Sequence, residues 1–276
     1  MTEPVAIRPD VVVGGGELVL LAGPCALESR ELALAVAGHL QATCARLGVP
    51  LVFKASFDKA NRTAAGSFRS IGLEPALEIL AEIRDALDVP VMTDVHETWQ
   101  VAPVAEVVDV IQIPAFLCRQ TDLLTAAGAS GRVVNIKKGQ FMAPDDMGYA
   151  ADKARGDAAG RVLLTERGTS FGYHDLVVDL RGLAVMRRFA PVVFDATHSV
   201  QSPGGAGGSS GGQREHVAGL ARAAVAFGID ALFLEVHPRP DEALSDRATQ
   251  LSFDALDELL ADCVTLGQRK AAAGVR

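Results

Sequence analysis

The chain has 276 residues and a formal net charge of −8, and nearly half of its residues are apolar. This length suits one large domain spanning 1–276, and the negative charge excludes bulk affinity for nucleic acid or an anionic membrane surface. No apolar run reaches the ~20 residues that a membrane-spanning helix needs. The four cysteines lie far apart and no secretory signal is recognised, so we expect no disulfide framework and a cytoplasmic protein.

Residues 1–17 are mixed in character and end in three glycines, so we expect them to form a short N-terminal extension. After this extension, short apolar runs alternate with amphipathic stretches, which is the pattern of repeated strand and helix units. Runs dominated by Val, Leu and Ala suit buried parallel strands. The eight expected strands are 18–23, 51–56, 90–95, 110–114, 133–137, 162–167, 192–197 and 231–237.

Between the strands, apolar residues recur every three or four positions, which predicts helices such as 30–47, 73–87 and 216–227. Gly48 and Gly228 are suited to end the first and the last of these. An open doubly wound sheet would show the same alternation, but it usually binds its ligand at one switch point. Here polar residues follow nearly every strand, so we predict an α/β fold with a single (β/α)₈ TIM barrel.

The segment 202–212 is rich in Gly and Ser and follows the seventh expected strand. It is either a flexible surface linker or a closing loop whose backbone N–H groups meet an anion. We favour the closing loop, because a helix is expected to begin near Gln213.

Polar side chains gather at the carboxyl ends of the expected strands, where catalytic groups of such barrels lie. Charged groups at the ends of apolar strands need a shared polar ligand to be tolerated there. In chain order they are Cys25, Lys54, Lys59, Asp94, His96, Gln112, Lys137, Lys138, Gln140, Arg167, Asp195, His198, Glu235 and His237.

Four of the cations among these groups are expected to converge: Lys54, Lys59, Lys137 and Arg167. A single lysine of this kind is most simply a solvated charge or part of an ordinary ion pair. Four cations converging on one cleft instead require an anionic substrate, and a phosphate together with a carboxylate would supply that charge. Arg62, within Asn61-Arg62-Thr63, is placed to serve a second phosphate.

A metal site is harder to predict from spacing, since the candidate ligands come from separate strands. A cysteine, a histidine and two carboxylates would suit a divalent transition metal such as Fe²⁺, Zn²⁺, Mn²⁺ or Co²⁺. Taken alone, Cys25 is better interpreted as a small buried hydrophobe, and the same packing role is the simplest one for Cys44, Cys118 and Cys263. His96 and His237 either orient a neighbour or cap a strand.

Long motifs of the chain resemble one known family, the 3-deoxy-D-manno-octulosonate 8-phosphate synthases, also called 2-dehydro-3-deoxyphosphooctonate aldolases. The segments that carry the resemblance are AGPC at 22–25, FKASFDKANR at 53–62, TDVHE at 93–97, QIPAFLCRQTD at 112–122, NIKKGQ at 135–140, ERGTSFGY at 166–173, FDATH at 194–198 and EVHP at 235–238. The run at 53–62 is the most specific, because the related heptulosonate-phosphate synthases carry a Lys-Pro-Arg motif at that strand. Sialic acid synthases share only the broader barrel chemistry.

The resemblance implies that the protein joins phosphoenolpyruvate to D-arabinose 5-phosphate in lipopolysaccharide precursor synthesis. It implies phosphoenolpyruvate contacts from Lys54, Lys59, Gln112, Lys137 and Arg167, with Ser56 and Gln140 also binding substrate. It implies pentose phosphate contacts from Asn61, Arg62, Thr63, Asp94 and Ser210, although the family often has Ser in place of Thr63. Lys59, Asp94 and His198 are the residues expected to act in catalysis.

The resemblance also implies the metal-dependent branch of the family, because Cys25 follows Gly-Pro where the other branch has Asn. The matching ligands are Cys25, His198, Glu235 and Asp246. A homotetramer is implied as well, with Arg62, Phe116 or Arg119 near subunit interfaces and Phe116 and Arg119 closing the site of a neighbouring subunit. The remaining alternatives are a heptulosonate-phosphate or sialic acid synthase and a catalytically silent barrel that binds a phosphorylated metabolite.

Overall fold

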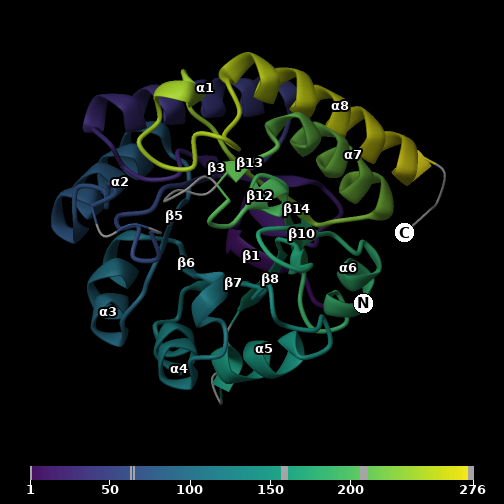
Figure 1. Ribbon diagram of the computed structural model, residues 1–276, viewed down its shortest axis with the longest axis horizontal. Helices are drawn as coiled ribbons and strands as arrows, with labels where there is room; N and C mark the ends of the chain where they lie inside the picture. Colours follow the sequence, from purple (N-terminus) through teal and green to yellow (C-terminus); the bar gives the residue numbers. More distant parts are fainter. Residues whose placement is uncertain (1, 63, 65, 157–160, 206–210, 273–276) are drawn as a thin grey trace.

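The computed structural model describes residues 2–62, 64, 66–156, 161–205 and 211–272, and its centre is a closed barrel of eight parallel strands (Figure 1). The first barrel strand pairs with the last, which closes the sheet without a free edge. The predicted (β/α)₈ fold is therefore confirmed. The barrel strands are β3 (Val19–Gly23), β4 (Leu51–Lys54), β5 (Val91–Asp94), β6 (Val110–Ile113), β7 (Val133–Lys137), β8 (Val162–Glu166), β11 (Val192–Asp195) and β14 (Ala231–Glu235).

Helices form a ring around the barrel (Figure 1). They are α1 (Arg30–Leu47), α2 (Leu73–Leu87), α3 (Thr98–Val107), α4 (Thr121–Ala129), α5 (Met147–Arg155), α6 (Arg181–Met186), α7 (Val217–Phe227) and α8 (Phe253–Ala272). In α2, for example, Ala76, Ile79, Leu80 and Ile83 are buried, which is the spacing of one helical face. The predicted helices 30–47 and 73–87 have these bounds in the structure.

Several predicted element ends differ from the structure by one or two residues. The predicted strands 51–56, 192–197 and 231–237 run past the last residues of β4, β11 and β14. The apolar and hydroxyl residues that directly follow these strands are still buried, although they no longer pair with a neighbouring strand. The apolar run in the sequence is therefore longer than the strand. The helix predicted at 216–227 begins at Val217, because 3₁₀ turn η4 (Arg214–His216) precedes it. The other 3₁₀ turns are η1 (Ala115–Leu117), η3 (His198–Val200) and η5 (Pro240–Glu242).

The N-terminal extension is an ordered antiparallel hairpin of β1 (Val5–Arg8) and β2 (Val11–Val13). Its buried valines and Ile7 join the apolar cluster inside the barrel, which includes Leu21 and Phe233. The guanidinium of Arg8 donates to both carboxylate oxygens of Asp109, which directly precedes β6. The hairpin therefore closes the barrel at the amino-terminal ends of its strands, and a second, larger apolar cluster fills the space between strands and helices.

Two short hairpins stand at the opposite end of the barrel. One joins β9 (Thr169–Ser170) to β10 (Leu176–Val177), and the other joins β12 (Gln201–Ser202) to β13 (Gly211–Gly212). The second hairpin contains the loop predicted to close over an anion. Its residues 206–210, including Ser210, lie outside the described residues, as does Thr63.

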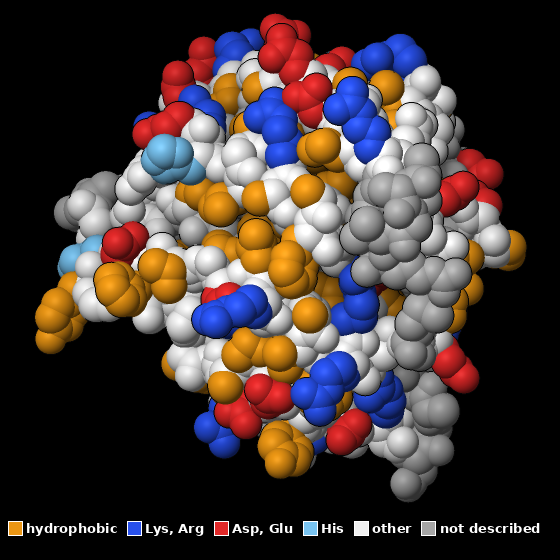
Figure 2. Space-filling view, turned by 90° about the vertical axis from the view of Figure 1, so that its right-hand side faces the viewer, with side chains coloured by type: hydrophobic (Ala, Val, Ile, Leu, Met, Phe, Trp, Pro, Cys, Tyr) orange, Lys and Arg blue, Asp and Glu red, His pale blue; other side chains and the backbone are white. Residues whose placement is uncertain are grey.

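The large hydrophobic side chains that remain exposed are mostly aromatic, and hydrophobic groups on one face are visible in Figure 2. The cysteines other than Cys25 have the packing role predicted for them: Cys44 lies in α1, Cys118 follows η1, and Cys263 lies in α8, all buried and free. Across the described residues, no helix has both the length and the apolar character needed to cross a bilayer.

Candidate active site

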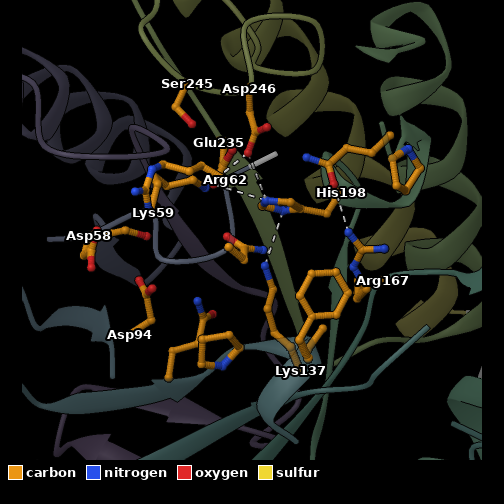
Figure 3. A pocket seen from close by; sticks show the side chains of 18 of the residues that line it. Asp58, Lys59, Arg62, Asp94, Lys137, Arg167, His198, Glu235, Ser245 and Asp246 are labelled. Atoms are coloured by element: carbon orange, nitrogen blue, oxygen red, sulfur yellow. Dashed lines mark hydrogen bonds and ion pairs between the residues drawn. The ribbon is translucent and has the colours of Figure 1, made fainter. Parts of the chain in front are cut away.

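A cavity of about 660 Å³ opens at the carboxyl ends of the barrel strands. This volume is within the range of small-molecule sites. Figure 3 shows labelled side chains directed into the cavity from several strand ends. The predicted site residues that line it are Lys54, Ser56, Lys59, Asn61, Arg62, Asp94, Gln112, Phe116, Lys137, Gln140, Arg167, His198, Glu235 and Asp246.

Among the predicted site residues that the structure describes, two do not line this cavity. Cys25 is buried just behind its wall, where its Sγ atom lies 3.1 Å from Asp246 Oδ2. Arg119 is exposed in the turn that follows η1, and it is absent from the lining formed by the described residues. The structure therefore places Phe116 at the cavity of its own chain but not Arg119.

Three of the four predicted metal ligands form a compact cluster: Cys25, Glu235 and Asp246 each offer an atom within 4.8 Å of the other two. The fourth, His198, lies beside them, with its Nε2 atom 3.4 Å from Glu235 Oε1 and 3.7 Å from Asp246 Oδ2. These residues come from the ends of β3, β11 and β14 and from the loop after β14. Barrel closure thus joins positions up to 221 residues apart in the sequence.

The cluster fits a divalent cation on the state of its oxygen and sulfur atoms. Both carboxylate oxygens of Glu235 are fully buried, and neither accepts a hydrogen bond within the described residues. Burial, followed by the charges of Asp246 and Glu235, raises the pKa of the Cys25 thiol well above its usual value. A cation bound here would satisfy the oxygens and favour the thiolate, and the mixed donor set suits a transition metal.

His198 is held in place by Asp195, which is the last residue of β11. Asp195 Oδ2 lies 2.7 Å from His198 Nδ1, while Asp195 Oδ1 accepts the backbone N–H of His198. Burial would raise the pKa of Asp195, but His198 and Lys137 together hold it well below its usual value. A carboxylate on one imidazole nitrogen that leaves the other facing a ligand cluster is the usual surrounding of a metal-binding histidine.

Buried cations face the cluster across the cavity. Lys137 Nζ lies 2.6 Å from Asp195 Oδ2 and 4.2 Å from the centre of the Phe233 ring. Arg167 donates to Gln201 Oε1, and its NH1 nitrogen is buried without a partner among the described residues. An unpartnered buried guanidinium nitrogen is costly, so this arrangement favours binding of an oxyanion.

Lys54 and Lys59 complete the positive wall. Lys54 Nζ donates to Ser56 Oγ and lies 3.9 Å from Asp94 and 3.8 Å from Glu235. Lys59 Nζ lies 2.9 Å from Cys25 Sγ and 3.2 Å from Asp246 Oδ2. Burial alone would lower the pKa of Lys59, but the charges of Asp246, Cys25 and Glu235 raise it well above its usual value, so Lys59 carries a proton.

Asp94 remains a carboxylate at the edge of the cavity. Burial would raise its pKa, but Lys54 and then His96, whose Nε2 lies 2.9 Å away, hold the pKa well below its usual value. His96 therefore orients a neighbour, which was one of the two roles open to it. The Asp94 carboxylate is available to accept a hydroxyl hydrogen bond.

A buried chain of hydrogen bonds fixes the side chain of Gln112. Thr165 Oγ1 donates to Asn135 Oδ1 at 2.6 Å, and Asn135 Nδ2 donates to Gln112 Oε1 at 3.2 Å. All three side chains are buried. With its oxygen occupied in this way, the Gln112 amide presents its NH₂ group to the cavity as a donor.

Sequence reasoning missed the residue that ties Cys25 to the loop carrying Asp246. Gln250 is fully buried, accepts the backbone N–H of Cys25 and donates to the carbonyl oxygen of Ser245. Asp246 itself has φ of 45°, in the left-handed region. Gln250 lies outside every strand and helix that the structure describes, so no periodicity of the sequence indicated it. The backbone conformation of Asp246 has no local sequence signal either.

Comparisons with known proteins identify the family to which the chain belongs. A profile described as the DAHP synthetase I family matches residues 3–269. Proteins named 2-dehydro-3-deoxyphosphooctonate aldolase are similar to the chain: that of Desulfotalea psychrophila is 55% identical over 270 residues, covering 96% of each chain, and that of Syntrophotalea carbinolica is 57% identical over 259 residues, covering 93% of this chain and 94% of its own. A third, from Nitrobacter winogradskyi, is 59% identical over 254 residues, covering 89% and 88%.

These matches span nearly the whole chain, and they confirm the resemblance indicated by the motifs at the strand ends. The chain therefore belongs to the DAHP synthetase I family, among its 2-dehydro-3-deoxyphosphooctonate aldolases.

Proposed function

We propose that the protein condenses phosphoenolpyruvate with D-arabinose 5-phosphate and water, giving 3-deoxy-D-manno-octulosonate 8-phosphate and inorganic phosphate. It is an enzyme of the transferase class that acts in lipopolysaccharide precursor synthesis. The observation that carries the proposal is the cavity in which Lys54, Lys137 and Arg167 face the cluster of Cys25, Glu235 and Asp246. The names of the relatives and the run at 53–62 support the choice of sugar.

Phosphoenolpyruvate is the substrate that best suits the buried cations, because it carries a carboxylate and a phosphate on the same carbon atom. Lys54, Lys137 and Arg167 neutralise these groups, and Gln112 donates its NH₂ group to one of their oxygens. Ser56 and Gln140 complete this part of the cavity. Asn61 and Arg62 also line the cavity and are more exposed than these cations, so they are suited to hold the pentose phosphate, and Asp94 accepts a sugar hydroxyl.

In the reaction, C3 of phosphoenolpyruvate forms a bond to the aldehyde carbon of the pentose, and water adds its oxygen at C2. The aldehyde oxygen becomes an alkoxide and takes up a proton, for which protonated Lys59 is the proposed donor. The water that adds at C2 keeps one proton as a C2 hydroxyl and gives up the other, which restores the proton on Lys59. The C2 hydroxyl then loses its proton to the departing phosphate as the C2–O bond to phosphate breaks, which leaves a ketone and inorganic phosphate. Holding both substrates in one cavity supplies much of the acceleration.

Cys25, His198, Glu235 and Asp246 would hold a divalent ion such as Fe²⁺, Zn²⁺, Mn²⁺ or Co²⁺. When bound, this ion would act as a Lewis acid that orients or polarises the aldehyde or the water. Asp195 keeps the His198 ring in the orientation that ligation needs. We also propose that the chain belongs to the metal-dependent branch of the family.

The proposed assembly is a cytoplasmic homotetramer formed by one domain per chain, residues 1–276. Exposed aromatic side chains near the cavity support association, because Phe116, Phe141, Phe171 and Tyr173 expose most or about half of their surface. Exposed apolar groups of this size are typical of subunit contacts. Arg62, Phe116 and Arg119 are the residues that we place near these contacts.

Phosphate release from phosphoenolpyruvate tests the proposal directly when D-arabinose 5-phosphate, erythrose 4-phosphate and an N-acylmannosamine are compared. We expect turnover with the five-carbon sugar to be at least about 100-fold higher than with the others. A site built to hydrogen-bond one sugar can discriminate to this extent, because a different sugar leaves some of its buried polar groups unpaired. Higher turnover with erythrose 4-phosphate would make the protein a heptulosonate-phosphate synthase. Binding of phosphoenolpyruvate without phosphate release would make it a silent barrel.

The metal is tested by chelation followed by addition of single divalent ions to the same sample. Activity is expected to fall with the metal content and to return when a suitable ion is added. Full activity in a sample shown by elemental analysis to contain no metal would contradict the metal-dependent assignment while leaving the condensation intact.

A further inference from the structure

Lys138 and Glu166 form a fully enclosed ion pair beside the cavity but not in it. Lys138 is 0% and Glu166 is 2% exposed, and the Lys138 Nζ atom lies 3.4 Å from Glu166 Oε1. Neither residue lines the cavity. The reaction proposed above uses neither side chain, although burying two charges is expensive.

The pair lies on the outer face of the barrel because side chains alternate along a strand. Lys137 and Arg167 point into the cavity, so their neighbours Lys138 and Glu166 point toward the helices. On this side, a Cβ atom built at Gly182 of α6 would lie 3.7 Å from Glu166 Oε2, an ordinary van der Waals distance, so the carboxylate packs beside α6.

Strand register places the two residues opposite each other. Lys137 pairs with Thr165 in the β7–β8 ladder, and the Lys138 backbone N–H donates to the Thr165 carbonyl oxygen. The ion pair therefore joins the ends of β7 and β8 one residue beyond the last ladder pair. It spans the same two strand ends that carry Lys137 and Arg167 on the inner face.

Further hydrogen bonds connect the Lys138–Glu166 ion pair to the turn after β8. Glu166 Oε1 accepts the backbone N–H groups of Arg167 and Gly168 at 3.0 and 2.7 Å. Lys138 Nζ donates to Thr169 Oγ1 at 3.0 Å and to the carbonyl oxygen of Gly168 at 3.4 Å. Gly168 has φ of 92°, a value at which residues with a side chain are strained, so the turn favours glycine at this position.

We propose that the Lys138–Glu166 pair is a positioning device that sets the distance and direction between Lys137 and Arg167, and thereby the geometry that binds phosphoenolpyruvate. This inference rests on the proposed function, which assigns that ligand to the two cations. Buried ion pairs add little net stability compared with neutral residues of similar shape, so stability does not account for this pair. The pair acts through its neighbours and does not touch the substrate.

The experiment replaces both charges at once in Lys138→Met/Glu166→Gln, since either single change leaves one charge buried. The glutamine side chain introduced by Glu166→Gln keeps an oxygen for the Arg167 and Gly168 N–H groups, so the double variant loses the ionic link and the hydrogen bonds that Lys138 donates to Thr169 and Gly168. We expect the melting temperature to stay close to that of the wild type, the KM for phosphoenolpyruvate to rise at least tenfold, and the KM for D-arabinose 5-phosphate to stay within twofold. A variant with a lowered melting temperature but an unchanged KM for phosphoenolpyruvate would overturn the inference.

Arg8→Met/Asp109→Asn is the matched control, because it removes an ion pair at the opposite end of the barrel. It is expected to lower stability and to leave both KM values unchanged. If this control raised the KM for phosphoenolpyruvate as much as the Lys138 and Glu166 variant, general loosening would explain the effect and the inference would be wrong.

Calorimetric titration with phosphoenolpyruvate separates this inference from the proposed function. If the wild type binds phosphoenolpyruvate but releases no phosphate with any sugar, the proposed condensation fails, and the ratio of dissociation constants between variant and wild type decides the inference. A tenfold weaker binding by the variant supports it, and equal binding overturns it. A wild type that does not bind phosphoenolpyruvate would overturn both.

Discussion

Asp195 Oδ2 lies 2.7 Å from Nδ1 of His198, and this contact leaves the Nε2 atom of the imidazole facing Glu235 and Asp246. The carboxylate lies at the end of a rigid strand, and His198 begins the short turn that follows. The proposed metal site, with ligands from separate loops, would thus depend on a residue that is not itself a ligand.

Asp195→Asn is expected to weaken the binding of a divalent ion roughly 10- to 100-fold, because the histidine loses the charged partner that fixes its orientation. Competition with a chromophoric chelator measures this affinity without reference to turnover. Asp94→Asn changes a carboxylate of the same cavity that does not contact His198, and it is expected to bind the ion as the wild type does. Equal affinity in Asp195→Asn would show that the ring is held by other contacts.

Thr165→Val tests the hydrogen-bond chain that orients Gln112. The substitution removes a hydroxyl with little change of shape, so the Asn135 and Gln112 amides become free to turn. We expect the KM for phosphoenolpyruvate to rise about fivefold, which corresponds to ~1 kcal/mol for one hydrogen bond. Thr165→Ser keeps the donor and should restore the wild-type value. Steady-state kinetics that show no difference between Val and Ser at this position would exclude the chain as a determinant of binding.

Stability above about pH 9 should depend on the buried thiol of Cys44. Burial raises the pKa of Cys44 to about 12. In the unfolded chain the thiol loses its proton near its usual pKa of about 8.5, so the folded state is the one that retains the proton and stability falls as the pH rises. The contribution is intact below about pH 8.5 and is progressively lost up to about pH 12.

Urea unfolding at about pH 9.5 and 10.5 measures this loss. Between these pH values, the unfolding free energy of Cys44→Ala should fall by about 1.4 kcal/mol less than that of the wild type. Val36→Ala shortens another buried side chain of α1 without removing a titrating group, and it should follow the wild-type pH dependence. Parallel curves for all three proteins would contradict the raised pKa of Cys44.

The barrel was predictable because each of its strands is buried on both faces and therefore appears as a continuous apolar run. The same property made the strand ends uncertain, since Ala196 and Val236 remain buried after the ladder ends. The N-terminal hairpin was missed, although Pro9-Asp10 between two valine-rich runs is a recognisable turn signal. Its role depends on long-range packing inside the barrel.

The site was predictable where a side chain lies at the end of a strand, as Lys137 and Arg167 do. It was not predictable for Asp246, which lies in a loop and reaches Cys25 only through the fold, so family resemblance alone named it. Lys138 is the opposite case. Its place at a strand end predicted that it would face the cavity, but side chains alternate along a strand, and Lys138 points toward the helices. Gly23 adds a constraint that no local pattern reveals: a Cβ there would lie 1.9 Å from the Lys54 carbonyl oxygen.

The hairpin of β1 and β2 has a practical consequence for anyone handling this enzyme. Because its apolar side chains fill the amino-terminal end of the barrel, the cavity formed by the described residues opens at the other end. A linker attached ahead of the hairpin starts from the filled end. Immobilising the protein through its N-terminus should therefore leave the opening directed toward the solution, whereas a bulky group attached beside Pro203, which lines the cavity, would hinder the molecules that enter.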